Sequence, residues 1–176
     1  MGIRAIMASI LVLSGGLIGC DRPNIINQVL PTNSSPDLTA ANTNTTPPTG
    51  LEKSVHQQIN QYRQKRNLPP LTLDSRISEQ ARLHSKAMAS GKVPFSHNGF
   101  DQRVKAINRV IPYYKAAENV AFNKGYSNPG QQAVEGWIKS NGHRINIVGQ
   151  YNLTGIGIVK NAQDEYYFTQ IFILSR

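Results

Sequence analysis

Leu153-Thr154-Gly155-Ile156-Gly157-Ile158-Val159-Lys160 is the stretch that decides the fold class of this chain. A second segment, 165–174, follows it, and both are rich in β-branched or aromatic residues, as strands are. The intervening Asn161-Ala162-Gln163-Asp164 predicts a hairpin loop. We therefore expect the chain to end in two antiparallel strands.

The segments before the hairpin predict helices. Leu51, Val55, Ile59 and Tyr62 recur at helical spacing, which predicts a helix over 51–66 that Asn67-Leu68-Pro69-Pro70 stops. Asp74 is expected to cap a second helix over 75–90, which Gly91 ends. Helices followed by a hairpin indicate an α+β fold, with the helices packed on an antiparallel sheet.

Two more helices are expected in the second half of the chain. One covers 100–107, and the other begins after Ser127 or Asn128 and ends near residue 140, where Gly142 can adopt the positive φ of a helix end. A short extended piece is expected at 71–73, and 118–121 can supply a further strand or edge.

The N-terminal segment is typical of an export signal. Arg4 precedes a short apolar stretch that is too short to span a bilayer comfortably. Leu17-Ile18-Gly19-Cys20 resembles a bacterial lipobox, so we expect a lipoprotein signal peptide over 1–19 and acylation of Cys20, the only cysteine. An ordinary signal peptide with an incidental cysteine is the alternative. Either reading predicts export, and the first predicts a lipid anchor in the bacterial cell membrane or outer membrane.

Residues 20–50 are expected to form an Asn/Thr/Pro-rich disordered tether, which leaves 51–176 as a single domain. The chain carries a formal net charge of +9 without a long basic run, so we expect no nucleic-acid partner. The charge agrees equally with simple solubility and with a preference for anionic lipid headgroups, wall polymers or acidic polysaccharide. We expect the protein to be a monomer.

Two histidines lie in polar contexts that packing alone does not explain. His97 lies in Ser96-His97-Asn98-Gly99-Phe100 and His143 in Asn141-Gly142-His143-Arg144, with Glu118 between them. Two imidazoles and a carboxylate can build a polar cleft for a metal or for acid–base chemistry. His84, in contrast, lies on an apolar helical stripe, where we expect a core histidine bonded to a carbonyl.

An ordered set of residues carries a family resemblance. The set is Met88-Ala89, His97, Phe100 with Arg103, Glu118-Asn119, Val134 with Trp137, Gly142-His143-Arg144, Asn146-Ile147, Gly155-Ile156-Gly157 and Thr169-Gln170. It resembles the bacterial branch of the CAP superfamily (cysteine-rich secretory protein, antigen 5 and pathogenesis-related 1), also called SCP/TAPS. The resemblance covers nearly all of 51–176 and implies a three-layer α–β–α sandwich with an open cleft.

The resemblance also implies site residues. The family's cleft holds two histidines and two acids, and some members bind zinc through the histidines. His97 and His143 match the histidines, and are the candidate zinc ligands, while Glu118 matches the first acid. Ser140 stands where the second acid is usual, and Glu135 is no obvious substitute because it lies about 140° away around the helix.

Three functions follow from this set. The first is a binding module for an envelope component, a lipid-like ligand or a partner protein. The second is a metal-dependent hydrolase in which His97 and His143 hold the ion and Glu118, the candidate catalytic residue, activates water. The third is a structural cleft, since Arg103 could pair with Glu118 and make the whole set structural. The sequence leaves enzymatic activity open.

Overall fold

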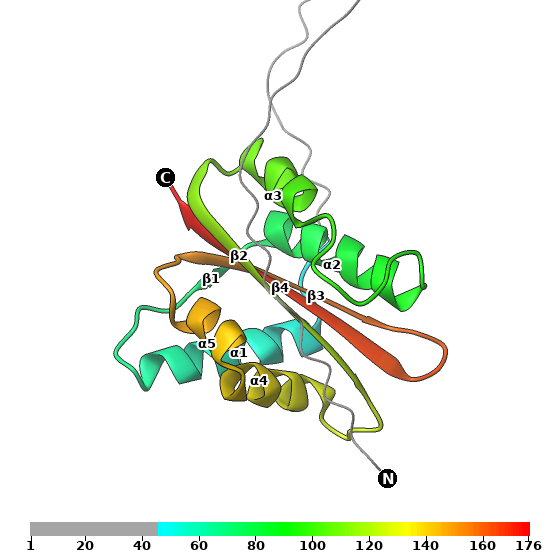
Figure 1. The fold of residues 1–176 in the computed structure, drawn as a ribbon. Helices are drawn as coiled ribbons and strands as arrows, with labels where there is room; N and C mark the ends of the chain where they lie inside the picture. Colours follow the sequence, from blue (N-terminus) through cyan, green and yellow to red (C-terminus); the bar gives the residue numbers. More distant parts are fainter. Residues whose placement is uncertain (1–45) are drawn as a thin grey trace, which may run out of the picture. The chain divides into compact units, whose positions relative to one another are not determined.

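The computed structural model describes residues 46–176, so the signal segment, Cys20 and most of the expected tether lie outside the described residues. Five helices and four strands are present in this part of the chain (Figure 1). They are α1 (Gly50–Gln64), β1 (Thr72–Leu73), α2 (Ser75–Ala89), α3 (Phe100–Asn108), β2 (Tyr113–Lys124), α4 (Pro129–Lys139), α5 (Asn141–Val148), β3 (Leu153–Lys160) and β4 (Glu165–Ser175).

The strands form one sheet in the order β1-β3-β4-β2. β3 and β4 are the predicted hairpin, and β2 pairs antiparallel with β4 from Tyr113 opposite Ser175 to Lys124 opposite Glu165. The two-residue β1 pairs parallel with β3, which makes an otherwise antiparallel sheet mixed. The expected strand at 118–121 is the middle of β2, a long strand at one edge of the sheet.

Helices cover both faces of the sheet, as the sandwich prediction requires (Figure 1). One core lies between the sheet and helices α1, α4 and α5, and it includes Ile59, Trp137 and Phe172. The other lies under α2 and α3 and includes Ile77 and Ile107. The α+β sandwich predicted from the sequence is therefore confirmed.

Two glycines of β3 let α2 approach the sheet closely. A Cβ at Gly155 would overlap the backbone of Ile77 and Ser78, and one at Gly157 would overlap the backbone of Ala81 and Arg82. Side chains larger than hydrogen at either position would push α2 away. The Gly-Ile-Gly pattern of β3 thus fixes the distance between α2 and β3.

The helix ends follow the predicted caps with one exception. Asp74 and Asn128 accept hydrogen bonds from the first turns of α2 and α4, and Gly91 has a φ of 72° after α2. The expectation for Gly142 was wrong, because this glycine lies inside α5 and does not have a positive φ. Ser140 is extended at φ −85° and ψ 122°, so it ends α4 and begins α5 without a left-handed residue.

The described part of the chain is held together by its own contacts. Both hydrophobic cores lie within residues 46–176, and Arg82 joins the N-terminal end of this part to α1 by binding the Thr46 carbonyl and the Glu52 carboxylate. We therefore expect residues 46–176 to fold independently. No helix in residues 46–176 has the length and apolarity needed to span a membrane.

Candidate functional site

Glu118 lies at the centre of the candidate site. Its side chain is on β2 and only 2% exposed, and the guanidinium of Arg103 on α3 grips both of its oxygens. Arg103 Nε donates to Oε2 and Nη2 donates to Oε1, each at 2.8 Å. This bidentate geometry is the strong form of an arginine–carboxylate pair. The pairing that sequence analysis weighed against a functional site is present.

His97 is attached to the same carboxylate. Its Nδ1 lies 2.9 Å from Glu118 Oε1, and because an ionised carboxylate only accepts, Nδ1 must carry the proton. Arg103 also donates to the carbonyl oxygens of His97 and Asn98, so one guanidinium holds both the carboxylate and the loop with the imidazole. The His97 side chain is 39% exposed, and its Nε2 has no hydrogen-bond partner in residues 46–176.

His143 lies in the first turn of α5 and is held by neutral groups. Its Nδ1 is 2.8 Å from the hydroxyl of Ser140, the residue that begins the helix. Asn119 donates to the His143 carbonyl, and Asn146 donates to Asn119 Oδ1 and to the Glu118 carbonyl. These amides join α5 to the edge strand, and the Nε2 of His143 is without a hydrogen-bond partner in the described part of the chain.

The two imidazoles are close enough to influence each other. Burial lowers the pKa of His143 below its ordinary value, and the positive charge of His97 lowers it further. His143 is therefore neutral at neutral pH. Glu118 and Asn119 are consecutive in β2, so their side chains leave opposite faces of the strand, and the two halves of the site meet across the sheet edge.

We call the set His97, Arg103, Glu118, Ser140 and His143 the His–Glu site. The structure brings together all five of the residues that the sequence singled out. Glu118 has both oxygens engaged by Arg103 and His97, so it is arranged to orient an imidazole and not to take a proton from water.

The donor set of the site limits metal binding. His97 Nε2 and His143 Nε2 are the two available ligand atoms, and no cluster of three or more His, Cys, Asp or Glu suited to a metal occurs within residues 46–176. Catalytic zinc sites have three protein ligands. The residues fit a weak two-imidazole site and do not fit a catalytic zinc centre.

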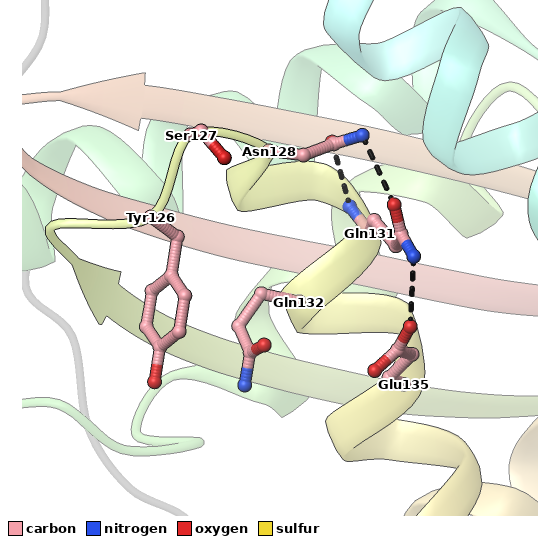
Figure 2. A pocket seen from close by; sticks show the side chains of 6 residues that line it. All are labelled: Tyr126, Ser127, Asn128, Gln131, Gln132 and Glu135. Atoms are coloured by element: carbon pink, nitrogen blue, oxygen red, sulfur yellow. Dashed lines mark hydrogen bonds between the residues drawn. The ribbon is translucent and has the colours of Figure 1, made fainter.

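A separate pocket lies beside the first turns of α4. Figure 2 shows its lining side chains, which are Tyr126, Ser127, Asn128, Gln131, Gln132 and Glu135. Glu135 accepts a hydrogen bond from Gln131 and pairs with Lys139. Glu135, which sequence analysis judged no obvious substitute for the second acid, is therefore part of this pocket and is engaged there.

His84 supports the loop that carries His97. Its Nε2 lies 2.8 Å from the Ser96 carbonyl, and the residue is 5% exposed, as expected for a core histidine bonded to a carbonyl. Burial and then the positive charge of Arg103 lower its pKa. His84 is a structural neighbour of the His–Glu site.

Sequence reasoning missed the roles of several neighbours. Asn119 is completely buried and joins β2 to α5, which a polar residue within a strand pattern does not indicate. Phe95, two residues before His97, forms a contiguous aromatic cluster with Phe122 and Tyr167, with centroid distances of 6.4 and 5.1 Å. Their spacing along the chain, in a loop and two strands, gave no local signal.

Comparison with known proteins shows which family this chain resembles. Residues 56–172 match the CAP family, described as the cysteine-rich secretory protein family. YkwD of Bacillus subtilis (strain 168), an uncharacterized protein, is 35% identical over 154 residues, which are 81% of this chain and 56% of YkwD. The chain thus spans about half the length of this curated relative.

Solved structures agree in fold. An extracellular protein containing an SCP domain from Bacillus anthracis is similar with a TM-score of 0.59 and 29% identity, over 70% of this chain and 40% of that chain. An outer surface protein from Borrelia burgdorferi has a TM-score of 0.60 at 17% identity, over 72% of this chain and 93% of that chain, and shows the fold alone. The match of most of the chain to one family, and its identity to YkwD, show that this chain belongs to the CAP family.

Proposed function

We propose that the protein is an exported CAP-domain lipoprotein, with a signal peptide at 1–19, an acylated Cys20, a tether up to residue 50 and the CAP domain at 51–176. Two observations support export: the leader pattern in the sequence, and the extracellular and surface proteins among the structural relatives. The N-terminal part of this proposal concerns residues outside the described range.

The anchor has a direct test. Cys20→Ala should release the mature protein from the membrane fraction of the producing cells into the medium or periplasm, and should abolish labelling by a tagged fatty acid. A Ser14→Ala variant in the same segment leaves the lipobox intact and is the matched control. Membrane retention and unchanged labelling of the Cys20→Ala protein would contradict lipidation.

The CAP domain acts in this proposal as a binding module, with the His–Glu site as its binding surface. The observation that carries the proposal is the full engagement of Glu118, whose two oxygens bind Arg103 and His97. A carboxylate held in this way fixes the His97 ring before any ligand arrives, and preorganisation of this kind favours affinity. Two imidazole Nε2 atoms then stay available to a ligand.

The surroundings of the site indicate a ligand with polar and apolar parts. The imidazoles can donate or accept hydrogen bonds, and the neighbouring Phe95 and Phe122 rings are about as exposed as His97 itself. Aromatic faces accept sugar rings, acyl chains or apolar side chains. An envelope component, a lipid-like molecule or a partner protein fits this description.

Metal-dependent hydrolysis is the second candidate, and one observation favours it. Both Nε2 atoms are without partners and His143 is held neutral, which is the form that binds a metal. The site would have to gain a third ligand and a free base to hydrolyse a substrate, and the described residues supply neither in this arrangement.

One experiment separates the functions. Residues 46–176, unchanged and with His143→Ala, are titrated with two probes, soluble peptidoglycan fragments and dihexanoylphosphatidylglycerol, while backbone amide shifts and product formation are followed. A binding module shows shifts at 95–98, 118 and 140–146 that vanish in the variant, without products and with the thermal stability retained. Turnover that His143→Ala abolishes while binding survives would establish the hydrolase, and loss of fold in the variant without any probe binding would leave a scaffold.

A further inference from the structure

A surface at the N-terminal end of β2 contains none of the residues of the His–Glu site. It lies where α3 ends, β2 begins and β4 ends, next to the C-terminus in Figure 1. We call it the basic tyrosine surface, and it consists of Lys105, Arg109, Val110, Pro112, Tyr114 and Arg176. Two contacts hold Arg176 in it: Arg176 N donates to the Pro112 carbonyl, and its guanidinium lies 5.4 Å from the centroid of the Tyr114 ring.

Apolar side chains of this surface are exposed to solvent, although a neighbouring residue of the same loop is buried in the core. Ile111 is 5% exposed and packs under α2 and α3, whereas its neighbour Val110 is 54% exposed and Tyr114 is 72% exposed. Pro112 is exposed as well. The loop therefore anchors itself through Ile111, while Val110, Pro112 and Tyr114 at the start of β2 are exposed and bury little apolar area.

The charges of the surface have one sign. Lys105, Arg109 and Arg176 are exposed, and none of them has an ion-pair partner in residues 46–176. Elsewhere in the described part of the chain most acids are paired with a cation. Asp74, which binds Arg76 at 2.6 Å, is one example. Asp101 is an acid near this region: burial, and then the charge of Asp101, raise the pKa of the adjacent Tyr113. The surface retains a clear positive excess.

We propose that the basic tyrosine surface docks on a membrane that carries anionic lipids. Cations next to a tyrosine and small apolar side chains are the combination that the headgroup region accommodates, because the cations meet lipid phosphates while the tyrosine and apolar groups enter the interface. A hydrophilic polyanion would satisfy the charges and leave Val110 and Tyr114 in water. The exposed apolar groups therefore favour a membrane.

The first described residues, from Thr46 to the start of α1, lie away from this surface. The described chain begins beside Arg82, and Glu52 in the first turn of α1 accepts from the backbone of Ile158, which pairs with Phe168. Phe168 is six residues from Leu174 along β4, a distance of about 20 Å. The inference is independent of the His–Glu site, and with the proposed anchor at Cys20 even weak docking would be effective, since the tether makes it intramolecular.

Vesicle binding tests the proposal. Residues 46–176 are sedimented with phosphatidylcholine vesicles that contain or lack phosphatidylglycerol. We expect binding only to the anionic vesicles. Lys105→Glu/Arg109→Glu should weaken this binding about tenfold or more, because the attraction of two cations to an anionic membrane surface is together enough for a tenfold difference in affinity. Lys53→Glu/Lys92→Glu makes the same charge change at exposed, unpaired positions elsewhere and should have a much smaller effect.

Tyr114→Ala separates a membrane from a soluble polyanion. This substitution leaves the charge of the protein unchanged. If the surface meets a membrane, the variant should bind anionic vesicles more weakly than the parent does, and this difference should remain at high salt. Its thermal stability should stay close to that of the parent, because the ring is exposed. Equal losses in the two double variants would show non-specific attraction and overturn the proposal. Unchanged vesicle binding in Tyr114→Ala, with full displacement by soluble polyphosphate, would assign the surface to a polymer and would also overturn it.

Discussion

The two halves of the His–Glu site are held by different chemistry. The half around His97 is a network of charges, in which a buried guanidinium binds a buried carboxylate and the carboxylate binds the imidazole. The half around His143 contains a hydroxyl and two amides, and burial keeps its imidazole neutral. The same residue type is thus fixed by ions on one side of the sheet edge and by neutral dipoles on the other.

This difference indicates how the site can respond to change. A buried ion pair loses much of its stabilisation when one partner is removed, because the other charge is left without compensation. A neutral hydrogen bond costs less to break, although a buried amide that loses its partner still carries a penalty. We therefore expect the charged half to be rigid and intolerant, and the neutral half to be the one in which substitutions tune affinity.

The largest effect is expected at Arg103. Arg103→Met leaves Glu118 buried and without its guanidinium, and should lower the free energy of unfolding by about 3–5 kcal/mol. Urea unfolding of residues 46–176 measures it. The double variant Arg103→Met/Glu118→Met removes both charges and should lose less than the single variant. A double variant that loses the sum of the two single effects would show that the pair is not coupled.

A smaller effect is expected in the neutral half. Asn119→Ala removes the side-chain donor to the His143 carbonyl and one of the two acceptors of the Asn146 amide, and should cost about 1–3 kcal/mol. Hydrogen exchange should show faster opening of α5 than of α2 in this variant, because α5 loses its connection to β2. Asn98→Ala in the exposed loop is the control and should change the exchange of α5 little. Uniform acceleration across the domain would contradict a local role for Asn119.

The pH dependence of stability reports on two histidines: His143 in the neutral half, and His84, which supports the loop that carries His97. The pKa values of His84 and His143 are lowered in the folded protein, so below the ordinary histidine pKa of about 6.5 the unfolded chain binds protons that the folded chain resists. This contribution to stability is complete above about pH 6.5 and is lost as the pH falls toward the lower folded pKa values.

We therefore expect the melting temperature to fall between about pH 7 and about pH 5.5, and to fall less in His143→Asn and in His84→Gln. The slope against pH is the readout, because each substitution also changes the stability at every pH. His56→Gln is the control, since this histidine of α1 is bonded to the Leu71 carbonyl and is not part of the His–Glu site. A slope that neither His84→Gln nor His143→Asn alters would contradict the assignment.

The smallest effect is expected at Ser140. Ser140→Ala removes one hydroxyl from a half-buried position and should cost about 1 kcal/mol or less. Its effect should be visible in the ring resonances of His143, which loses its Nδ1 partner, and absent from those of His97. A change at His97 of the same size would show that the halves are not separately held.

The sequence predicted the layers of the molecule because periodic patterns report on local structure. The β3–β4 hairpin and the helix begun by Asp74 were visible in this way, and the hairpin glycines turned out to set the approach of α2. Gly142 was misjudged because the extended Ser140 ends one helix and begins the next, which depends on where α5 packs and not on the local residues.

The candidate site was only partly visible for the same reason. His97, Glu118 and His143 were singled out by their polar contexts and matched to site positions by the family resemblance, and Arg103 was recognised as a potential partner of Glu118. The amide network of Asn119 and Asn146 and the aromatic cluster at Phe122 join segments far apart in the chain, so no local pattern could indicate them. The partner of each buried group is decided by tertiary packing.

Zinc titration by calorimetry tests the central claim, that Glu118 orients His97 in a two-imidazole binding site. Residues 46–176 are compared with His97→Ala, His143→Ala and Ser140→Glu, which restores a carboxylate beside His143. The account predicts no micromolar or tighter zinc binding in the unchanged protein, and an affinity about tenfold or more higher in Ser140→Glu, because a carboxylate at His143 Nδ1 makes that imidazole a stronger ligand. Micromolar or tighter binding in the unchanged protein, lost in both alanine variants, would contradict it and establish a metal centre.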